Sequence, residues 1–382
     1  MALKAVHVSD VPNLDATLAL CPTLFSNEIE GDVGDHGTTS FELPNKFVVM
    51  GHRGSGMNML QSPDRRMKAI KENSILAFDA AGKFALDFIE FDVQVTKDDC
   101  PVIFHDSFIL TKEKGAITEK RVTELTLVEF LSHGPQKEPK IVEKPLYRKT
   151  KDGRIFEWNV ETDAPLCTLQ EVFQEVDHSL GINIELKFDD NIVYKEEELV
   201  NVLQSILKVV FEYAKDRHII FSSFQPDAAQ LMRKLQTTYP VFFLTNGGSE
   251  ICVDVRRNSL DEAINLCLEG GLQGIVSEVR AILRNPGSIT KIKESKLSLL
   301  TYGQLNNVPE VVYAQHLIGV DGVIVDLVQE ITEAVLDFIK LAKEGEGSLF
   351  RDKGEMRGKT KLQFSQHEPS FLLKHIHELI KS

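Results

Sequence analysis

Glu90 and Asp92 are two carboxylates separated by one residue inside the apolar run 88–92. Side chains two positions apart on a strand lie on the same face, so these carboxylates would be close neighbours. They would repel each other and be costly to desolvate unless a positive group compensates them. A divalent cation that prefers oxygen ligands, Mg²⁺ or Ca²⁺, would be such a group. For this pair alone, a solvated strand end with local salt bridges is the alternative.

A third carboxylate stands on a later run, 182–187, where Glu185 and Lys187 share one face. Glu185 could complete the cation site, while Lys187 could bind a phosphate oxygen. The alternative is an ion pair between these two side chains.

Two histidines and an arginine also stand at the ends of apolar runs. His52 and Arg53 follow the run 46–50 and Gly51, and His105 ends the run 102–105. The planar fork of an arginine suits phosphate, because it donates two parallel hydrogen bonds. A lone histidine in such a place is usually structural, but two histidines beside three carboxylates indicate a functional site.

Together these residues could cleave a phosphodiester. A cation, Arg53 and Lys187 would neutralise the phosphoryl oxygens. One histidine would take the proton of the nucleophile and the other would protonate the leaving alkoxide, each contributing about 10²–10⁴-fold. We therefore predict catalysis by His52 and His105, phosphate binding by Arg53 and Lys187, and binding of one divalent cation by the three carboxylates, Glu90, Asp92 and Glu185.

The elements that must position these residues alternate between strands and helices, which indicates βαβ units and a parallel sheet. Helical patterns occupy 73–84, 195–213, 227–235, 259–267 and 308–316, and a capping signal starts another at Thr168. One strand run, 102–105, follows its predecessor across the turn 96–99, so we assign it to a hairpin. The predicted strands are 46–50, 88–92, 102–105, 182–187, 219–222, 241–244, 274–279, 297–302 and 323–326.

About sixty residues separate His105 from the helix signal at Thr168, which is longer than an ordinary βα loop. A long insertion after a barrel strand falls at the carboxyl ends of the strands, where barrel sites lie. We interpret the insertion, about 107–166, as a cap over the site, with surface decoration as the alternative. The barrel would span 46–345, preceded by a tail or strap (1–45) and followed by an extension (346–382) with a short amphipathic helix.

Composition narrows the class of protein. The formal net charge of −14 argues against a protein that coats nucleic acid or anionic lipid. The five cysteines show no metal-binding spacing, which favours free thiols in a reducing compartment. No apolar run is long enough for a transmembrane helix, and no secretory signal begins the chain. We expect a cytoplasmic protein, with the plastid as the alternative, and the oligomeric state is left open.

At these residues the sequence resembles the glycerophosphodiester phosphodiesterase family, and most closely its soluble plant branch. The order and spacing of the matching segments cover about 46–330. The segments are Gly51–Gly54, Glu72–Ser74, Phe88–Asp98, Pro101–Asp106, Glu185–Lys187 and Gly319–Gly322.

The resemblance implies a TIM (β/α)8 barrel with an insertion after the early strands. It implies the cation, histidine and phosphate roles given above, and it adds Glu72 as a supporting site residue. Tyr302 stands where the family often has tryptophan, and it could wall the glycerol pocket. The implied reaction converts a glycerophosphodiester, such as glycerophosphocholine or glycerophosphoethanolamine, and water to sn-glycerol 3-phosphate and an alcohol.

Two other functions compete with this one. A lysophospholipase D or a phospholipase C-like enzyme on the same barrel would need similar groups, but no membrane-docking face is evident. A barrel retained for binding or regulation would have lost a site residue, and all are present. The head-group alcohol, Mg²⁺ versus Ca²⁺, and direct attack by water versus a cyclic phosphate are left open.

Overall fold

The computed structural model describes residues 46–137, 144–150 and 152–349. The predicted tail, 1–45, lies outside these residues, as does most of the predicted extension, 346–382, including its short helix. The predicted boundary at residue 345 falls within helix α11 (Val328–Leu349).

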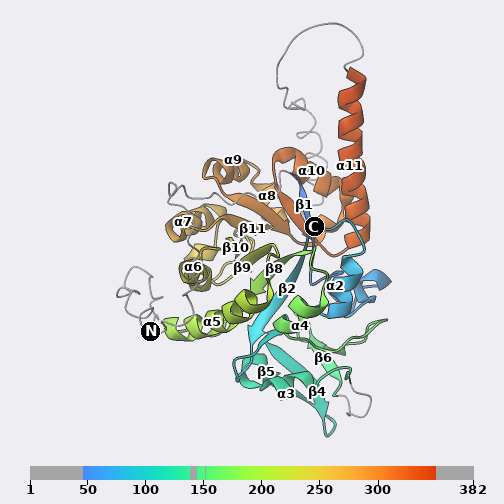
Figure 1. The fold of residues 1–382 in the computed structure, drawn as a ribbon, viewed down its shortest axis with the longest axis vertical. Helices are drawn as coiled ribbons and strands as arrows, with labels where there is room; N and C mark the ends of the chain where they lie inside the picture. Colours follow the sequence, from blue (N-terminus) through green and yellow to red (C-terminus); the bar gives the residue numbers. More distant parts are fainter. Residues whose placement is uncertain (1–45, 138–143, 151, 350–382) are drawn as a thin grey trace. The chain divides into compact units, whose positions relative to one another are not determined.

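Eight parallel strands close into a barrel, as predicted (Figure 1). The sheet closes because β1 pairs with both β13 and β2. Most residues of these strands are buried, which explains why their sequences are continuously apolar rather than alternating. In the order of pairing, the strands are β1 (Val48–Gly51), β13 (Gly322–Val325), β12 (Ser298–Tyr302), β11 (Gly274–Glu278), β10 (Val241–Thr245), β9 (Ile219–Ser223), β8 (Gly181–Leu186) and β2 (Phe88–Val95).

The ninth apolar run is the return strand of a hairpin, as predicted. Strand β3 (Pro101–Ile103) pairs antiparallel with the end of β2, with Val93 opposite Ile103. The N–H of Phe104 then donates to the carbonyl of Asp92 at 3.0 Å. The hairpin therefore returns the chain, and with it His105, along β2 to the level of Asp92.

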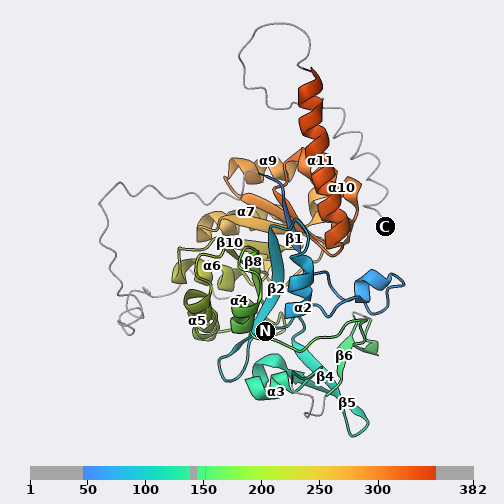
Figure 2. The ribbon, with the colours of Figure 1, turned by 45° about the vertical axis from the view of Figure 1, so that its right-hand side comes forward.

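Helices follow the strands and surround the barrel (Figure 2). Ser74 caps the first of them by accepting the N–H of Ala77, and Thr168 forms a capping box with Glu171, the signal seen in the sequence. The helices of the barrel are α2 (Ile75–Ala81), α4 (Leu169–Glu175), α5 (Glu196–Tyr213), α6 (Pro226–Leu235), α7 (Leu260–Gly270), α8 (Val279–Arg284), α9 (Gly287–Glu294), α10 (Pro309–Ile318) and α11. In the described residues, 3₁₀ turns lie between barrel elements at Arg65–Lys68, Val255–Arg257 and Gln304–Asn307, and another lies in the insertion at Val122–Glu124. No helix in the described part of the chain is both long and apolar enough to cross a membrane.

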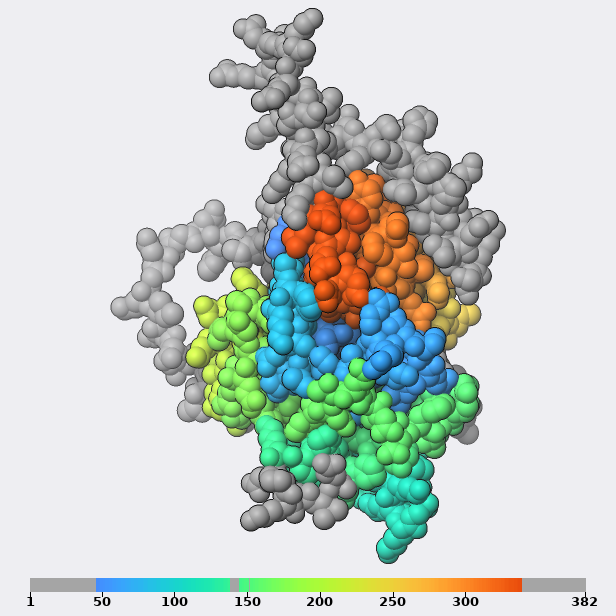
Figure 3. All heavy atoms as spheres, turned by 90° about the vertical axis from the view of Figure 1, so that its right-hand side faces the viewer, coloured from blue at the N-terminus to red at the C-terminus, as the bar shows by residue number. Residues whose placement is uncertain are grey.

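The described residues of the long insertion form a small antiparallel sheet and the short helix α3 (Leu127–Leu131). The strands, in order of pairing, are β5 (Ala116–Arg121), β4 (Phe108–Glu113), β6 (Leu146–Lys149) and β7 (Ile155–Glu157). The end of the insertion pairs with the segment before α2 through a β-bridge between Thr162 and Ile70. The two segments lie in contact in Figure 3. The predicted role of the insertion as a cap stays a prediction.

Candidate functional site

Three predicted carboxylates meet on the neighbouring strands β2 and β8, close to the point where the pairing of these two strands ends. Asp92 lies beside Glu185 in the register of these two parallel strands, and Glu90 precedes Asp92 on the same face. One oxygen from each of the three carboxylates lies within 4.8 Å of the others. Glu90 and Asp92 are 2% and 1% exposed. The pair that the sequence placed on one face is therefore buried, and the solvated strand end does not describe it.

The charges of this cluster are only partly compensated. Burial and the neighbouring charges of Asp92 and Glu185 raise the pKa of Glu90 to about 8. One oxygen of Glu90, Oε1, is buried without a hydrogen-bond partner. A largely buried, oxygen-rich cluster with an unpartnered acceptor is the donor set that suits Mg²⁺ or Ca²⁺, so the three carboxylates fit a divalent cation.

Asp92 keeps its charge because cations and an amide surround it. Burial alone would raise its pKa, but His105, Arg53 and Lys187 hold the pKa well below its usual range. Arg53 Nε lies 3.4 Å from Asp92 Oδ2, and Lys187 Nζ lies 3.6 Å from Oδ1. The side-chain amide of Asn73 donates to Oδ2 at 2.8 Å. Lys187 Nζ also donates to Glu185 at 2.8 Å. Lys187 therefore forms the ion pair given as the alternative and at the same time lies beside the carboxylate cluster.

His52 follows β1 and faces the cluster. Its Nδ1 lies 2.7 Å from Asp326 Oδ1, directly after β13, and its Nε2 lies 4.0 Å from Glu90 Oε2. Burial would lower the pKa of His52, but the Asp326 carboxylate raises it overall. A Cβ at Gly56 would come within 2.4 Å of the Asp326 carbonyl, so only glycine allows the turn after His52 to pack against this aspartate.

Arg53 is buried and pairs both with Asp92 of the cluster and with Glu72 behind it. Its backbone N–H donates to Glu90 Oε2 at 2.9 Å, and its guanidinium donates to Glu72 Oε1 at 2.7 Å. Burial would raise the pKa of Glu72, but the cations of Arg148 and Arg53 lower it to about 2. Glu72 therefore holds Arg53 as an ionised partner.

His105 follows the hairpin and interacts with Asp92 of the cluster. Its Nδ1 lies 2.7 Å from Asp106 Oδ1. Burial, with the cations of Arg53 and Lys187, lowers the pKa of His105. Each histidine thus binds an aspartate through Nδ1, which orients the ring. His52 Nε2 also accepts a hydrogen bond of 3.3 Å from Arg53 Nε, which places this nitrogen beside the guanidinium.

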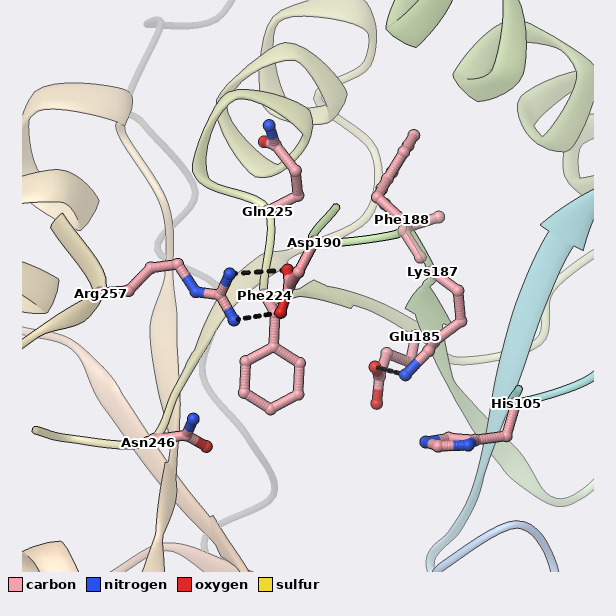
Figure 4. Close-up of a pocket in the computed structure, with 10 residues that line it drawn as sticks. His105, Glu185, Lys187, Phe188, Asp190, Phe224, Gln225, Asn246 and Arg257 are labelled. Atoms are coloured by element: carbon pink, nitrogen blue, oxygen red, sulfur yellow. Dashed lines mark hydrogen bonds and ion pairs between the residues drawn. The ribbon is translucent and has the colours of Figure 1, made fainter. Parts of the chain in front are cut away.

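A pocket of about 310 Å³ opens beside the cluster, with His105, Glu185 and Lys187 on one side (Figure 4). Arg257 faces them across the pocket and binds Asp190 through two hydrogen bonds of 2.7 and 3.3 Å. The remaining lining residues are Leu186, Phe188, Phe224, Gln225 and Asn246.

Tyr302 is not among the residues that line the pocket. It lies behind two of them, because its ring packs edge-on against Phe224 at 5.9 Å and its hydroxyl donates to Asn246. Among the other predicted site residues, His52, Arg53, His105 and Lys187 adjoin the three carboxylates, and Glu72 lies behind them in contact with Arg53.

Sequence reasoning missed four residues that hold the site in place. Asp326 ends a predicted strand and Asp106 follows His105 directly, so the strand-end rule could have found both. Asn73 stands beside Glu72 in a segment already noted. Arg148 lies inside the insertion, where no spacing or motif distinguished it.

Comparison with known proteins identifies the family of this chain. The model of the glycerophosphoryl diester phosphodiesterase family matches residues 52–330. The chain is 58% identical over 383 residues to glycerophosphodiester phosphodiesterase GDPD1, chloroplastic, of Arabidopsis thaliana, and the match covers 100% of both chains. It is 69% identical over 290 residues to GDPD3 of the same plant, covering 76% of this chain and 78% of that one.

The barrel also resembles a solved structure. This is a phosphodiesterase from Oleispira antarctica in complex with its product sn-glycerol-3-phosphate, with a TM-score of 0.53 and 18% identity. The match covers 75% of this chain and 96% of the other, and at this identity it supports the TIM-barrel fold alone. Family model and relatives together show that the chain belongs to the glycerophosphoryl diester phosphodiesterase family, in its plant branch.

Proposed function

We propose that this protein hydrolyses glycerophosphodiesters to sn-glycerol 3-phosphate and an alcohol, using one divalent cation held by Glu90, Asp92 and Glu185. The observation that carries the proposal is the convergence of these carboxylates, within 4.8 Å of one another, on two histidines that each bind an aspartate. The names of the relatives, glycerophosphodiester and glycerophosphocholine phosphodiesterases, support this substrate class.

The residues divide the chemistry among them. When bound, the cation would withdraw charge from the phosphoryl oxygens and make phosphorus easier to attack. Arg53 and Lys187 supply fixed positive charge at the same place. One of His52 and His105 takes a proton from the attacking oxygen, and the other returns a proton to the leaving alkoxide. Attack by water and attack by the glycerol hydroxyl require the same two transfers.

The proposal predicts that purified protein releases glycerol 3-phosphate from glycerophosphocholine only when a divalent cation is present. The assay compares protein treated with a chelator with the same protein after Mg²⁺ or Ca²⁺ is restored, because loss of the cation would remove a charge that its three ligands cannot replace. Release that continues unchanged in chelator would contradict the cation's role.

The lipid alternative is tested by following release of the head-group alcohol, because a lysophospholipase D releases choline and no glycerol 3-phosphate. Lysophosphatidylcholine and glycerophosphoethanolamine are offered at equal concentration beside glycerophosphocholine. Turnover of the lysolipid with glycerophosphodiesters left intact would replace the proposed substrate class by that of a lysophospholipase D.

For the location, we propose the plastid over the cytoplasm. The 58%-identical relative that matches this whole chain carries the word chloroplastic in its name. We expect the full chain fused to a fluorescent protein to enter chloroplasts in leaf cells, and a fusion of residues 46–382 to stay in the cytosol. Cytosolic fluorescence from both fusions would restore the cytoplasmic prediction.

A further inference from the structure

Arg148 lies on β6 of the insertion, yet its guanidinium reaches the two carboxylates behind the catalytic groups. It donates to Asp106 at 2.9 and 3.0 Å and to Glu72 at 2.8 and 3.0 Å. A fifth hydrogen bond, of 3.2 Å, goes to the carbonyl of Asn58. A guanidinium has five N–H groups, so these bonds use all of them.

The two carboxylates each hold one proposed site residue. Asp106 Oδ1 binds His105 Nδ1 at 2.7 Å, and Glu72 Oε1 binds the Arg53 guanidinium at 2.7 Å. Arg148 thus ties together the supports of a proton-transfer group and of a phosphate-binding group that come from different segments of the barrel. It touches neither the pocket nor the carboxylate cluster.

Arg148 is itself held in one position. Arg148 is 9% exposed, and its guanidinium stacks on the Trp158 ring, 4.1 Å from the ring centroid. Trp158 is also buried, and its indole N–H donates to the Asn58 side chain at 3.0 Å. The buried ammonium of Lys71 lies 3.8 Å from the same ring, so the ring contacts two cations.

We propose that Arg148 is a positioning residue of this enzyme, through which the insertion aligns His105 with Arg53. This inference rests on the proposed function. A planar fork that binds two carboxylates at once fixes their relative position, which a single point charge does not. Small displacements of reacting groups can cost about 10²-fold in rate. The insertion would therefore contribute to catalysis without lining the pocket.

Arg148→Lys keeps the charge but can bind only part of the two carboxylates. We expect kcat for glycerophosphocholine to fall about tenfold, with KM changed less than about threefold, because the phosphate and cation groups remain. Arg148→Met should cost about 10²-fold in kcat. The matched control is Arg154→Met, which removes an arginine of the same insertion that forms an exposed ion pair with Asp152. Its kcat and KM should stay within about twofold of the wild-type values.

A spectroscopic measurement separates failure of this proposal from failure of the proposed function. Imidazole resonances of His105, assigned with His105→Asn, should shift in Arg148→Lys and stay unchanged in Arg154→Met, whether or not the substrate is turned over. An unperturbed His105 signal together with wild-type kcat in Arg148→Lys would overturn the positioning role. A shifted signal in a protein that does not hydrolyse glycerophosphocholine would retain the alignment and reject the substrate.

Discussion

His52→Ala is expected to lower kcat for glycerophosphocholine by about 10²–10⁴-fold, with little change in KM. The imidazole is the group proposed to move a proton, and its Nδ1 contact with Asp326 at 2.7 Å orients it for that task. The substitution should leave the fold intact, because Asp326 keeps hydrogen bonds from Asn307 at 2.9 Å and from the N–H of Met57 at 3.0 Å. Steady-state rates and circular dichroism check both statements.

A double-mutant cycle sharpens this test. If Asp326 acts through His52, Asp326→Asn should lower kcat in the wild type and cost almost nothing further in His52→Ala. His178→Ala is the control, because it removes a histidine from an exposed pair with Asp216. Its kcat should stay within about twofold of the wild-type value. Equal losses from Asp326→Asn in both backgrounds would mean that the aspartate acts independently of His52.

The barrel could be predicted because its signals are local. Strands buried on both faces read as continuous apolar runs, and helix starts carry caps such as Ser74 and the Thr168–Glu171 box. The hairpin could be inferred from a surplus strand and a short turn. The sheet within the insertion was not predicted, because mostly exposed strands such as β5 and β7 carry no buried residue and little periodicity.

The carboxylate cluster could be inferred for a similar reason. Glu90 and Asp92 are two apart, so their shared face follows from strand geometry alone, and Glu185 and Lys187 repeat the pattern. Adding Glu185 to the same cluster required β2 and β8 to be neighbours, which the parallel βαβ arrangement implied.

The supports behind the site depend on long-range packing that the sequence does not display. His52 and Asp326 meet only because the barrel closes between its first and last strands. Arg148 reaches Glu72 from the separate antiparallel sheet of the insertion. Tyr302 packs against Phe224 and does not line the pocket. The order of the strands along the sequence does not reveal which of the two side chains faces the pocket.

The pH dependence of stability offers a test of the cation site that requires no substrate. Burial and the Asp92 charge raise the pKa of Glu90 to about 8, whereas the unfolded chain has a glutamate pKa of about 4.3. Between these values the folded protein holds a proton that the unfolded chain has released. The metal-free protein should therefore lose stability as pH rises from about 4.3 to 8, by several kcal/mol from this group. The depressed pKa of Asp92 adds no slope in that window, because both states are ionised there.

A divalent cation should reverse this loss, because it compensates the charges that raise the pKa of Glu90. At about 100 times its Kd, a ligand that binds only the folded state stabilises it by about 2.7 kcal/mol. For a chain of this size we expect the melting temperature at pH 8 to rise by about 3–5 °C when Mg²⁺ or Ca²⁺ replaces chelator.

Glu90→Gln should remove both effects, since an amide cannot ionise and is a poorer ligand than a carboxylate. Its melting temperature in chelator should vary less with pH, and the cation should raise it by much less. Glu278→Gln is the matched control, because Glu278 ends barrel strand β11 with a pKa that burial raises but lies outside the carboxylate cluster. That variant should respond to the cation like the wild type. If Glu90→Gln also responds in full, the cation binds elsewhere, and the three strand-end carboxylates must be stabilised by the neighbouring cations, Arg53 and Lys187.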